Sequence, residues 1–142
     1  MLLLDTNVLS EFMRPQPAQT VVAWLDAQSA EQLYTNAVSR AEIELGLALM
    51  PASKRQAALA RAAREMFDDD FAGRFLPFYE AAACAFARIV AARTRAGGPI
   101  EVEDAQIAAI ACVHGLRLAT RNVADFLGIE GLTVVDPWQA GL

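Results

Sequence analysis

The feature that most limits the fold is a short apolar run near the start of the chain that ends abruptly in polar residues. Leu2 to Leu4 carries no polar side chain, and Asp5, Thr6 and Asn7 follow at once. An uninterrupted apolar run of this length is typical of a strand that is buried on both faces of a parallel sheet. Asp, Thr and Asn are residues that cap the first turn of a helix. We therefore expect a central strand that leads directly into a helix.

Segments that predict strands and helices alternate along the rest of the chain. Helices are expected over residues 8–13 and 18–28, with Pro15 and Pro17 between them. The later segments are a strand over 33–38, a helix from 39 to 51, a surface helix over 53–70, a short strand over 74–78, helices over 80–96 and 104–114, a strand over 116–120, a short helix over 122–127 and a last strand over 132–135. This pattern predicts an α/β fold in one domain over residues 1–142, with a central, mostly parallel sheet of four to five strands flanked by helices.

The charge balance argues against a broad nucleic-acid surface. The chain has 12 Lys and Arg residues against 17 Asp and Glu, a formal net charge of −5, whereas such a surface is strongly basic. The longest stretch without a charged side chain, 105–116, falls short of the roughly 20 residues that a membrane-spanning helix needs. The N-terminus has no basic leader before its apolar run. We expect a cytoplasmic protein with no membrane partner.

Four carboxylates follow the predicted strands or open the helices after them: Asp5, Glu42, Asp104 and Asp125. Because the carboxyl ends of parallel strands meet at one edge of the sheet, we expect these side chains to lie close together there. Clustered carboxylates repel one another unless a cation neutralises them, and hard divalent cations prefer oxygen ligands. The pattern indicates metal-assisted phosphoryl transfer.

Structural explanations exist for each of these acids. Glu42 fits a capping box that begins at Ser39, Asp104 could balance the dipole of its helix, and Asp125 could cap a short helix. Asp5 is harder to explain in this way. A buried carboxylate at the end of an apolar strand must be hydrogen-bonded, paired or metal-bound.

Four segments together carry a resemblance to a known family. They are Leu3-Leu4-Asp5-Thr6-Asn7-Val8-Leu9-Ser10-Glu11, Ser39-Arg40-Ala41-Glu42-Ile43-Glu44-Leu45-Gly46, Asp104-Ala105-Gln106-Ile107-Ala108-Ala109-Ile110-Ala111 and Thr120-Arg121-Asn122-Val123-Ala124-Asp125-Phe126. In this order and at this chain length, the segments resemble the PIN-domain family of metal-dependent ribonucleases. The resemblance is strongest to its bacterial toxin branch, the VapC-like and FitB-like proteins of type II toxin–antitoxin modules.

The resemblance implies roles for individual residues. The catalytic and metal-binding residues would be Asp5, Glu42, Asp104 and Asp125, which hold Mg²⁺ or Mn²⁺ for hydrolysis of an RNA phosphodiester. Residues that orient these acids or hold the substrate would be Asn7, Thr6, Thr120 and Asn122. In this family the fourth acid, here Asp125, often acts through water. The acidic residues Glu101 and Glu103, just before Asp104, depart from the family's usual, less charged pattern.

The resemblance also implies partners. They are the RNA substrate and a small antitoxin whose C-terminal segment lies across the groove and blocks the metal site. A homodimer and a hetero-oligomer with the antitoxin are expected.

Arginines near the predicted site edge could contact phosphate or pair with acids: Arg14, Arg40 and Arg121. Trp138 is expected to be a packing residue.

Two other functions compete with this interpretation. One is a non-catalytic, partner-binding subunit of an operator-binding toxin–antitoxin complex, in which the acids only cap helices. The other is a phosphatase that forms an aspartyl-phosphate on Asp5. Asn7 counts against the phosphatase, because such enzymes place a second Asp at that position.

Overall fold

A five-stranded parallel sheet forms the centre of the molecule. The computed structural model describes residues 1–139. The strands are β1 (Leu2–Leu4), β2 (Leu33–Asn36), β3 (Phe75–Leu76), β4 (Arg117–Ala119) and β5 (Val134–Val135). Their order across the sheet is β3-β2-β1-β4-β5, and every neighbouring pair is parallel. The strand at the start of the chain is therefore central, as its apolar sequence predicts.

Six α-helices connect and cover the strands within residues 1–139. They are α1 (Thr6–Met13), α2 (Gln19–Asp26), α3 (Ala37–Leu49), α4 (Lys54–Glu65), α5 (Glu80–Arg95) and α6 (Val102–His114). Short helical turns lie at Ala30–Gln32, Met66–Asp70 and Val123–Phe126. The predicted α/β fold with a parallel sheet flanked by helices is confirmed. No helix in the described part of the chain is long and apolar enough to cross a membrane.

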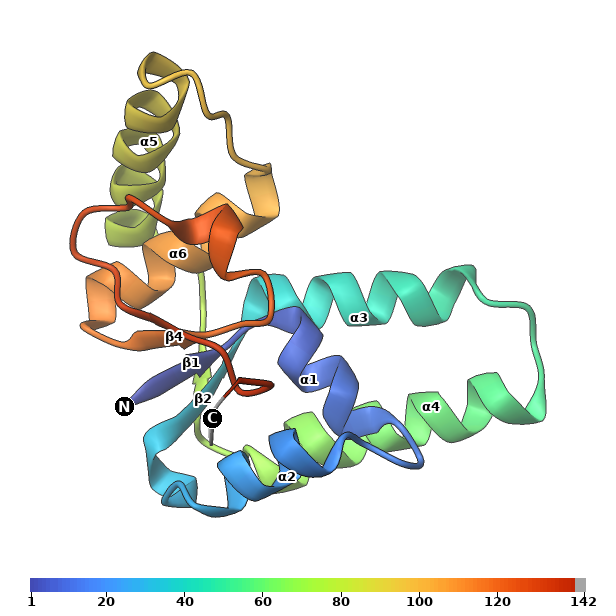
Figure 1. Cartoon of the computed structure of the whole chain (residues 1–142). Coiled ribbons are helices and arrows are strands. Elements are labelled where there is room, and N and C mark those ends of the chain that lie inside the picture. The colour runs from blue at the N-terminus through green and yellow to red at the C-terminus, as the bar shows by residue number, and fades with distance from the viewer. Residues whose placement is uncertain (140–142) are drawn as a thin grey trace.

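The sheet separates two apolar cores because successive side chains of a strand point to opposite faces. Leu3 of β1 belongs to the core beneath α5 and α6. Leu2 and Leu4 belong to the core on the other face, which also receives residues from α1 to α4. Figure 1 shows α5 and α6 together on one side of the strands and α2 and α4 on the other. Burial on both faces explains why β1 has no polar side chain.

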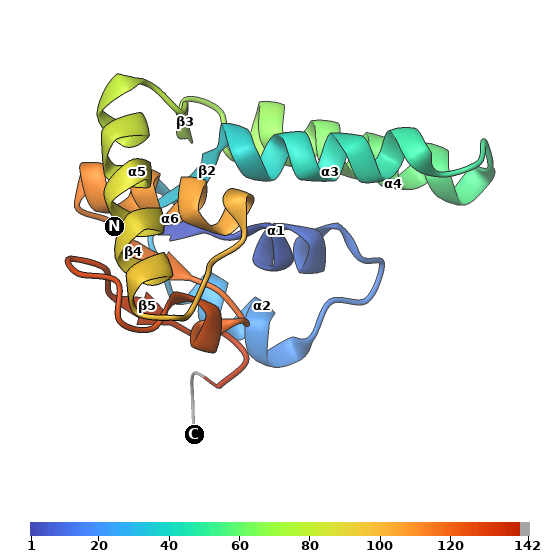
Figure 2. The same cartoon turned by 90° about the horizontal axis from the view of Figure 1, so that it is seen from above.

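Helices α3 and α4 form an antiparallel hairpin that projects beyond the sheet, and both views show them side by side (Figures 1 and 2). The predicted surface helix over 53–70 is only partly an exposed helix. Its regular part ends at Glu65, and the following turn buries Met66 and Phe67 against the core of α1 and α2. The hydrophobic effect draws this acidic segment inward through its two apolar residues.

Three helices begin earlier than predicted. Helix α1 begins at Thr6 rather than Val8, because Asp5 caps it. Helix α6 begins at Val102 rather than Asp104. Helix α3 begins at Ala37, and its N-terminal cap is Asn36, whose side-chain oxygen accepts the Ser39 N–H at 2.8 Å. The predicted strand over 33–38 therefore ends at Asn36. The capping box from Ser39 is wrong, because Ser39 lies within the first turn, and Glu42 is left without a capping role.

Candidate active site

One open pocket of about 520 Å³ lies where β1 and β2 end and the following helices begin. Its lining comes from α1, α3, α6 and the segment after β4: Asp5, Thr6, Asn7, Ser10, Glu11, Arg14, Glu42, Asp104, Arg121, Asn122 and Trp138. Three of the four predicted carboxylates are in this set. The parallel sheet thus brings together residues that are far apart in the sequence.

Asp5 caps helix α1 and is 4% exposed. Its Oδ1 accepts the Thr6 N–H at 2.8 Å. Its Oδ2 accepts the Thr120 hydroxyl at 2.6 Å and the Asn7 amide at 3.2 Å. Burial raises the pKa of Asp5 more than these hydrogen bonds lower it, and the charge of Asp125 adds to the increase. The carboxylate is held rigidly but is poorly solvated.

Thr120 is fully buried beneath the pocket and uses all the hydrogen-bonding capacity of its hydroxyl. It donates to Asp5, and its oxygen accepts the Asn7 amide at 3.2 Å and the Asn122 N–H at 3.1 Å. Asn7 in turn accepts the Arg121 N–H at 3.1 Å through its Oδ1. Residues from α1 and from the end of β4 therefore fix one carboxylate together.

Glu42 lies on the exposed face of α3, at the pocket rim. The Thr6 hydroxyl donates to its Oε1 at 2.7 Å and is also hydrogen-bonded with the Ser39 hydroxyl at 2.8 Å. Thr6 therefore connects the first turn of α1 to α3. This contact directs the Glu42 carboxylate to the side of the rim where Asp5 begins its helix.

Asp104 is partly buried in the first turn of α6. Burial raises its pKa to about 6, and the negative charges of Asp5, Asp125, Glu42 and Glu101 add to the increase, in that order. The dipole of α6 would favour a charged Asp104, yet burial and the surrounding acids together outweigh it. Negative charge is therefore concentrated around Asp104, which forms no ion pair within residues 1–139.

Asp125 differs from the other three acids in its relation to the pocket. It is exposed on the helical turn Val123–Phe126 and does not line the pocket. Its carbonyl oxygen accepts Arg93 Nη1 at 2.9 Å. Its charge nevertheless raises the pKa of both Asp5 and Asp104. Asp125 therefore acts on the pocket electrostatically from its edge.

The donor chemistry of the pocket suits a hard divalent cation. Asp5, Glu42 and Asp104 supply only carboxylate oxygens, which Mg²⁺ and Mn²⁺ prefer. Within residues 1–139, no group of three or more acidic, His or Cys side chains is arranged as a metal site. Hydrogen bonds to Thr6 and Thr120 hold two of the carboxylates instead. The ligand types fit a cation, which would neutralise the clustered negative charge.

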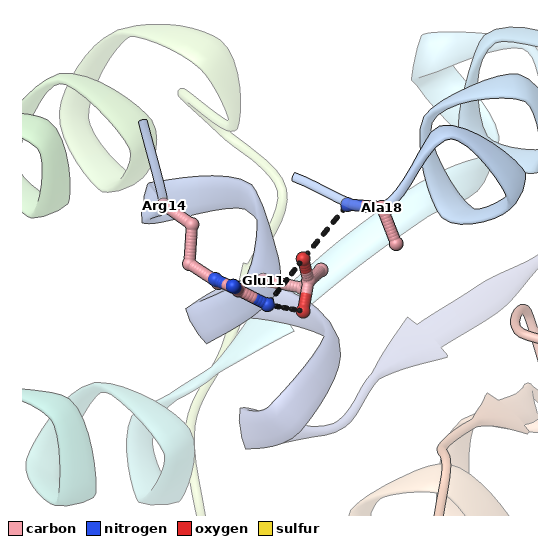
Figure 3. Close-up of polar contacts among 3 residues, drawn as sticks. All are labelled: Glu11, Arg14 and Ala18. Carbon is pink, nitrogen blue, oxygen red and sulfur yellow. Dashed lines mark hydrogen bonds and ion pairs between the residues drawn. The ribbon is translucent and has the colours of Figure 1, made fainter. Parts of the chain in front are cut away.

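Glu11 and Ser10 line the pocket but were not predicted as site residues. Together with Asn7 and Arg14 they occupy positions i, i+3, i+4 and i+7 of α1, a spacing that places polar side chains on one helical face. That periodicity was the available signal. Figure 3 shows Glu11 between Arg14 and the backbone N–H of Ala18.

The structure also places Arg40 and Trp138. Arg40 takes the second of its two expected roles, pairing with an acid. Arg40 does not line the pocket: it pairs with Asp68 at 3.2 Å and stacks over Phe67, with its carbon Cζ 4.9 Å from the ring centroid. Trp138 packs against the core as expected but also lines the pocket, beneath the Arg121 guanidinium at 5.0 Å. An arginine and an aromatic ring thus form one wall.

Comparison with known proteins gives a consistent result. The model of the PIN domain family matches residues 2–127. The VapC ribonuclease Y4jK of Sinorhizobium fredii is 40% identical over 139 residues, covering 98% of this chain and 99% of that protein. Toxin FitB of Neisseria gonorrhoeae is 41% identical over 139 residues, with the same coverage of both chains.

A solved structure shares the fold in detail. In the structure of FitAB bound to an IR36 DNA fragment, the matching chain is 40% identical, with a TM-score of 0.88. The match covers 97% of this chain and 96% of that one. The similarity thus extends over the sheet, the helices and the pocket segments alike.

Proposed function

Because this chain belongs to the PIN-domain family, among the VapC and FitB toxins of toxin–antitoxin systems, we propose that it is a metal-dependent endoribonuclease that hydrolyses RNA phosphodiester bonds. The observation that carries the proposal is the placement of Asp5, Glu42 and Asp104. They come from three separate elements and line one pocket, and burial together with the charges of Asp5 and Glu42 raises the pKa of Asp104. A purely structural role does not account for Glu42, which caps no helix.

In this proposal, Asp5, Glu42 and Asp104 hold Mg²⁺ or Mn²⁺, and Asp125 contributes its charge through water. The cation supplies an activated water and neutralises charge that develops on the phosphate. Thr120 and Asn7 keep Asp5 in one orientation, and Thr6 does the same for Glu42. Asn122 also lines the pocket, and in this proposal its amide contacts the substrate.

We also propose a protein partner. A small antitoxin would cover the pocket with its C-terminal segment, where a basic side chain would complement the acids. The protein would be a homodimer that assembles with the antitoxin into a hetero-oligomer, and residues 1–142 would act as one PIN domain. The support is the 40% identity with a chain in the FitAB structure.

The test is cleavage of a mixed RNA pool by the purified protein, freed of any small partner, in Mg²⁺, in Mn²⁺ and in chelator. Asp5→Asn and Asp104→Asn each remove an anionic ligand with little change in volume, so both should abolish cleavage. Asp26→Asn, at an exposed position of α2, is the matched control and should cleave like the wild type. Cleavage that persists in chelator or in Asp5→Asn would refute the proposed site. A wild type that neither cleaves RNA nor binds metal in calorimetry would refute the function.

A further inference from the structure

Glu11 is a buried carboxylate on the pocket wall to which the proposed metal chemistry gives no role. It is 5% exposed, and both of its oxygens are occupied (Figure 3). Oε1 accepts Arg14 Nη1 at 3.1 Å, while Oε2 accepts the same nitrogen at 3.2 Å and the Ala18 N–H at 2.9 Å. Both carboxylate oxygens of Glu11 thus bind protein groups, so Glu11 is not available to bind a ligand.

The surroundings of Glu11 keep it charged. Burial alone would raise its pKa, but the hydrogen bonds from Ala18 and Arg14, with the positive charges of Arg14 and Arg121, lower it. A buried anion of this kind is tolerated only when a cation stays beside it. Glu11 therefore restricts where the Arg14 guanidinium can lie.

Arg14 is held by only one of its nitrogen atoms. Nη1 makes both contacts with Glu11, and the Arg14 side chain is 62% exposed. Among residues 1–139, its Nε and Nη2 groups donate to no protein atom. The guanidinium thus lines the pocket with N–H groups at Nε and Nη2 that can donate to a ligand. Their planar arrangement matches the geometry of phosphate oxygens.

A second guanidinium reinforces this charge. Arg121 lines the same pocket, lies 5.0 Å from the Trp138 ring centroid, and is near enough to Glu11 to lower its pKa. The pocket therefore has an acidic part, formed by Asp5, Glu42 and Asp104, and a basic part at the far end of α1. A polymer with regularly spaced phosphates can use both parts at once.

We propose that Arg14, positioned by Glu11, binds an RNA phosphate next to the one that is cleaved. The inference rests on the proposed ribonuclease function and adds the means by which an acidic pocket holds an anionic chain. Arg14 is the binding residue and Glu11 is a positioning residue that acts through it. Binding at Arg14 orients the RNA backbone before its neighbouring phosphate reaches the carboxylates.

The experiment combines cleavage kinetics with binding of a 2′-O-methyl RNA oligomer, which lacks the free 2′-hydroxyl, measured by fluorescence anisotropy over a range of salt. Arg14→Ala should raise KM about tenfold, because a hydrogen bond to a charged group is lost, and should change kcat by less than about twofold. The slope of log Kd against log salt should flatten by about 0.7, the contribution of one single-strand phosphate contact. Arg14→Lys should restore part of the affinity. Arg95→Ala, an exposed arginine at the end of α5, is the control and should leave KM unchanged.

Glu11→Gln distinguishes a positioning role of Glu11 from a general electrostatic one, because the two roles predict opposite changes in RNA affinity. The substitution removes one negative charge, so general electrostatics predicts tighter RNA binding. Loss of the partner that fixes Arg14 predicts weaker binding and a raised KM, with kcat maintained. Thermal melts followed by circular dichroism show whether the Glu11→Gln protein is folded. If it is not, the comparison of Arg14→Ala with the wild type tests the inference, because Arg14 is at an exposed position.

Three outcomes would overturn the inference. One is a folded Glu11→Gln protein that binds the RNA as tightly as the wild type or more tightly. Another is an Arg14→Ala protein that matches Arg95→Ala in KM and in salt dependence. The third is an Arg14→Ala protein that loses binding of a ten-residue glutamate peptide but not of RNA, which would assign Arg14 to an acidic protein segment. A wild type that cleaves no RNA would refute the function separately, while the 2′-O-methyl probe still measures the contribution of Arg14.

Discussion

Asp104 is the residue at which the electrostatics of the pocket are least favourable. Its pKa is about 6 in the folded protein and about 3.8 without the fold. The folded state therefore binds this proton more tightly, and the free energy of unfolding of the metal-free protein falls as the pH rises from about 4 to about 6. The full shift would correspond to roughly 3 kcal/mol, but the side chain is partly solvated, so we expect a loss on the order of 1 kcal/mol.

Urea unfolding in chelator at pH 4, 5, 6 and 7 measures this loss. Asp104→Asn should remove this contribution to the pH dependence and should be more stable than the wild type at pH 7. Asp26→Asn should keep the wild-type dependence. Adding Mg²⁺ should then stabilise the wild type more than Asp104→Asn, because the cation neutralises the same charge. A wild type and Asp104→Asn with the same pH dependence would show that Asp104 titrates normally.

Thr120 offers a second prediction at this scale. Thr120→Val keeps the volume but removes the hydroxyl that donates to the buried Asp5 carboxylate at 2.6 Å. We expect the free energy of unfolding to fall by about 1–3 kcal/mol at pH 7, because a buried acceptor loses its partner. Thr133→Val, at an exposed position, should change it by less than about 0.5 kcal/mol. Equal effects of the two substitutions in urea unfolding would contradict the proposed support of Asp5.

The sequence predicted which carboxylates lie near the pocket, but it did not predict their burial or their hydrogen-bond partners. Asp5, Glu42 and Asp104 follow strands or open helices, and the geometry of parallel sheets brings such positions together. Asp125 also satisfies that rule, yet the turn that carries it leaves its side chain exposed beside the pocket. The periodicity of α1 indicates the helical face on which Glu11 lies, but its burial was not predictable, because one of its donors is the Ala18 N–H at the start of the next helix.

The start of α3 illustrates how elements are positioned. Asn36 is fully buried: its oxygen caps α3 at the Ser39 N–H, and its amide donates to the Leu4 carbonyl oxygen at 3.3 Å and the Ser39 hydroxyl at 3.1 Å. One side chain thus links the end of β1 to the helix that carries Glu42. The sequence contains two start signals, Asn36 and Ser39, and the contact with β1 selects the first. Most element positions were predictable from periodicity, but this boundary depended on a tertiary hydrogen bond.

Asn36→Ala tests this link. We expect the free energy of unfolding to fall by about 2–3 kcal/mol, since the cap and the buried contact to β1 are lost together. Ser53→Ala removes the exposed cap of α4, where the Ser53 hydroxyl accepts the Gln56 N–H at 3.0 Å, and should cost about 1 kcal/mol. Urea unfolding of both variants gives the comparison. If the Ser53 variant lost as much stability as the Asn36 variant, the contact with β1 would contribute nothing.

At the scale of the whole molecule, the order of the strands in the sheet decides which side chains lie together in the pocket. Strand β1 lies between β2 and β4, so the segments after all three strands border one pocket. The alternation of strands and helices made this architecture predictable. Arg14 and Arg121 were expected near the edge of the site, but their arrangement into one basic part was not predictable, because it depends on how the α1 face meets Arg121 and Trp138 from the other end of the chain.

This charge distribution predicts weak salt dependence of RNA binding. The chain has a net charge of −5, and the pocket contains two arginines, Arg14 and Arg121. Two single-strand phosphate contacts give a slope of log Kd against log salt of about 1.4, since each contributes roughly 0.7. Anisotropy titrations of the 2′-O-methyl RNA, with Mg²⁺ held constant, measure the slope. A slope of about 4 would require several further cationic contacts, and binding would then depend on a surface outside the pocket or on a second copy of the chain.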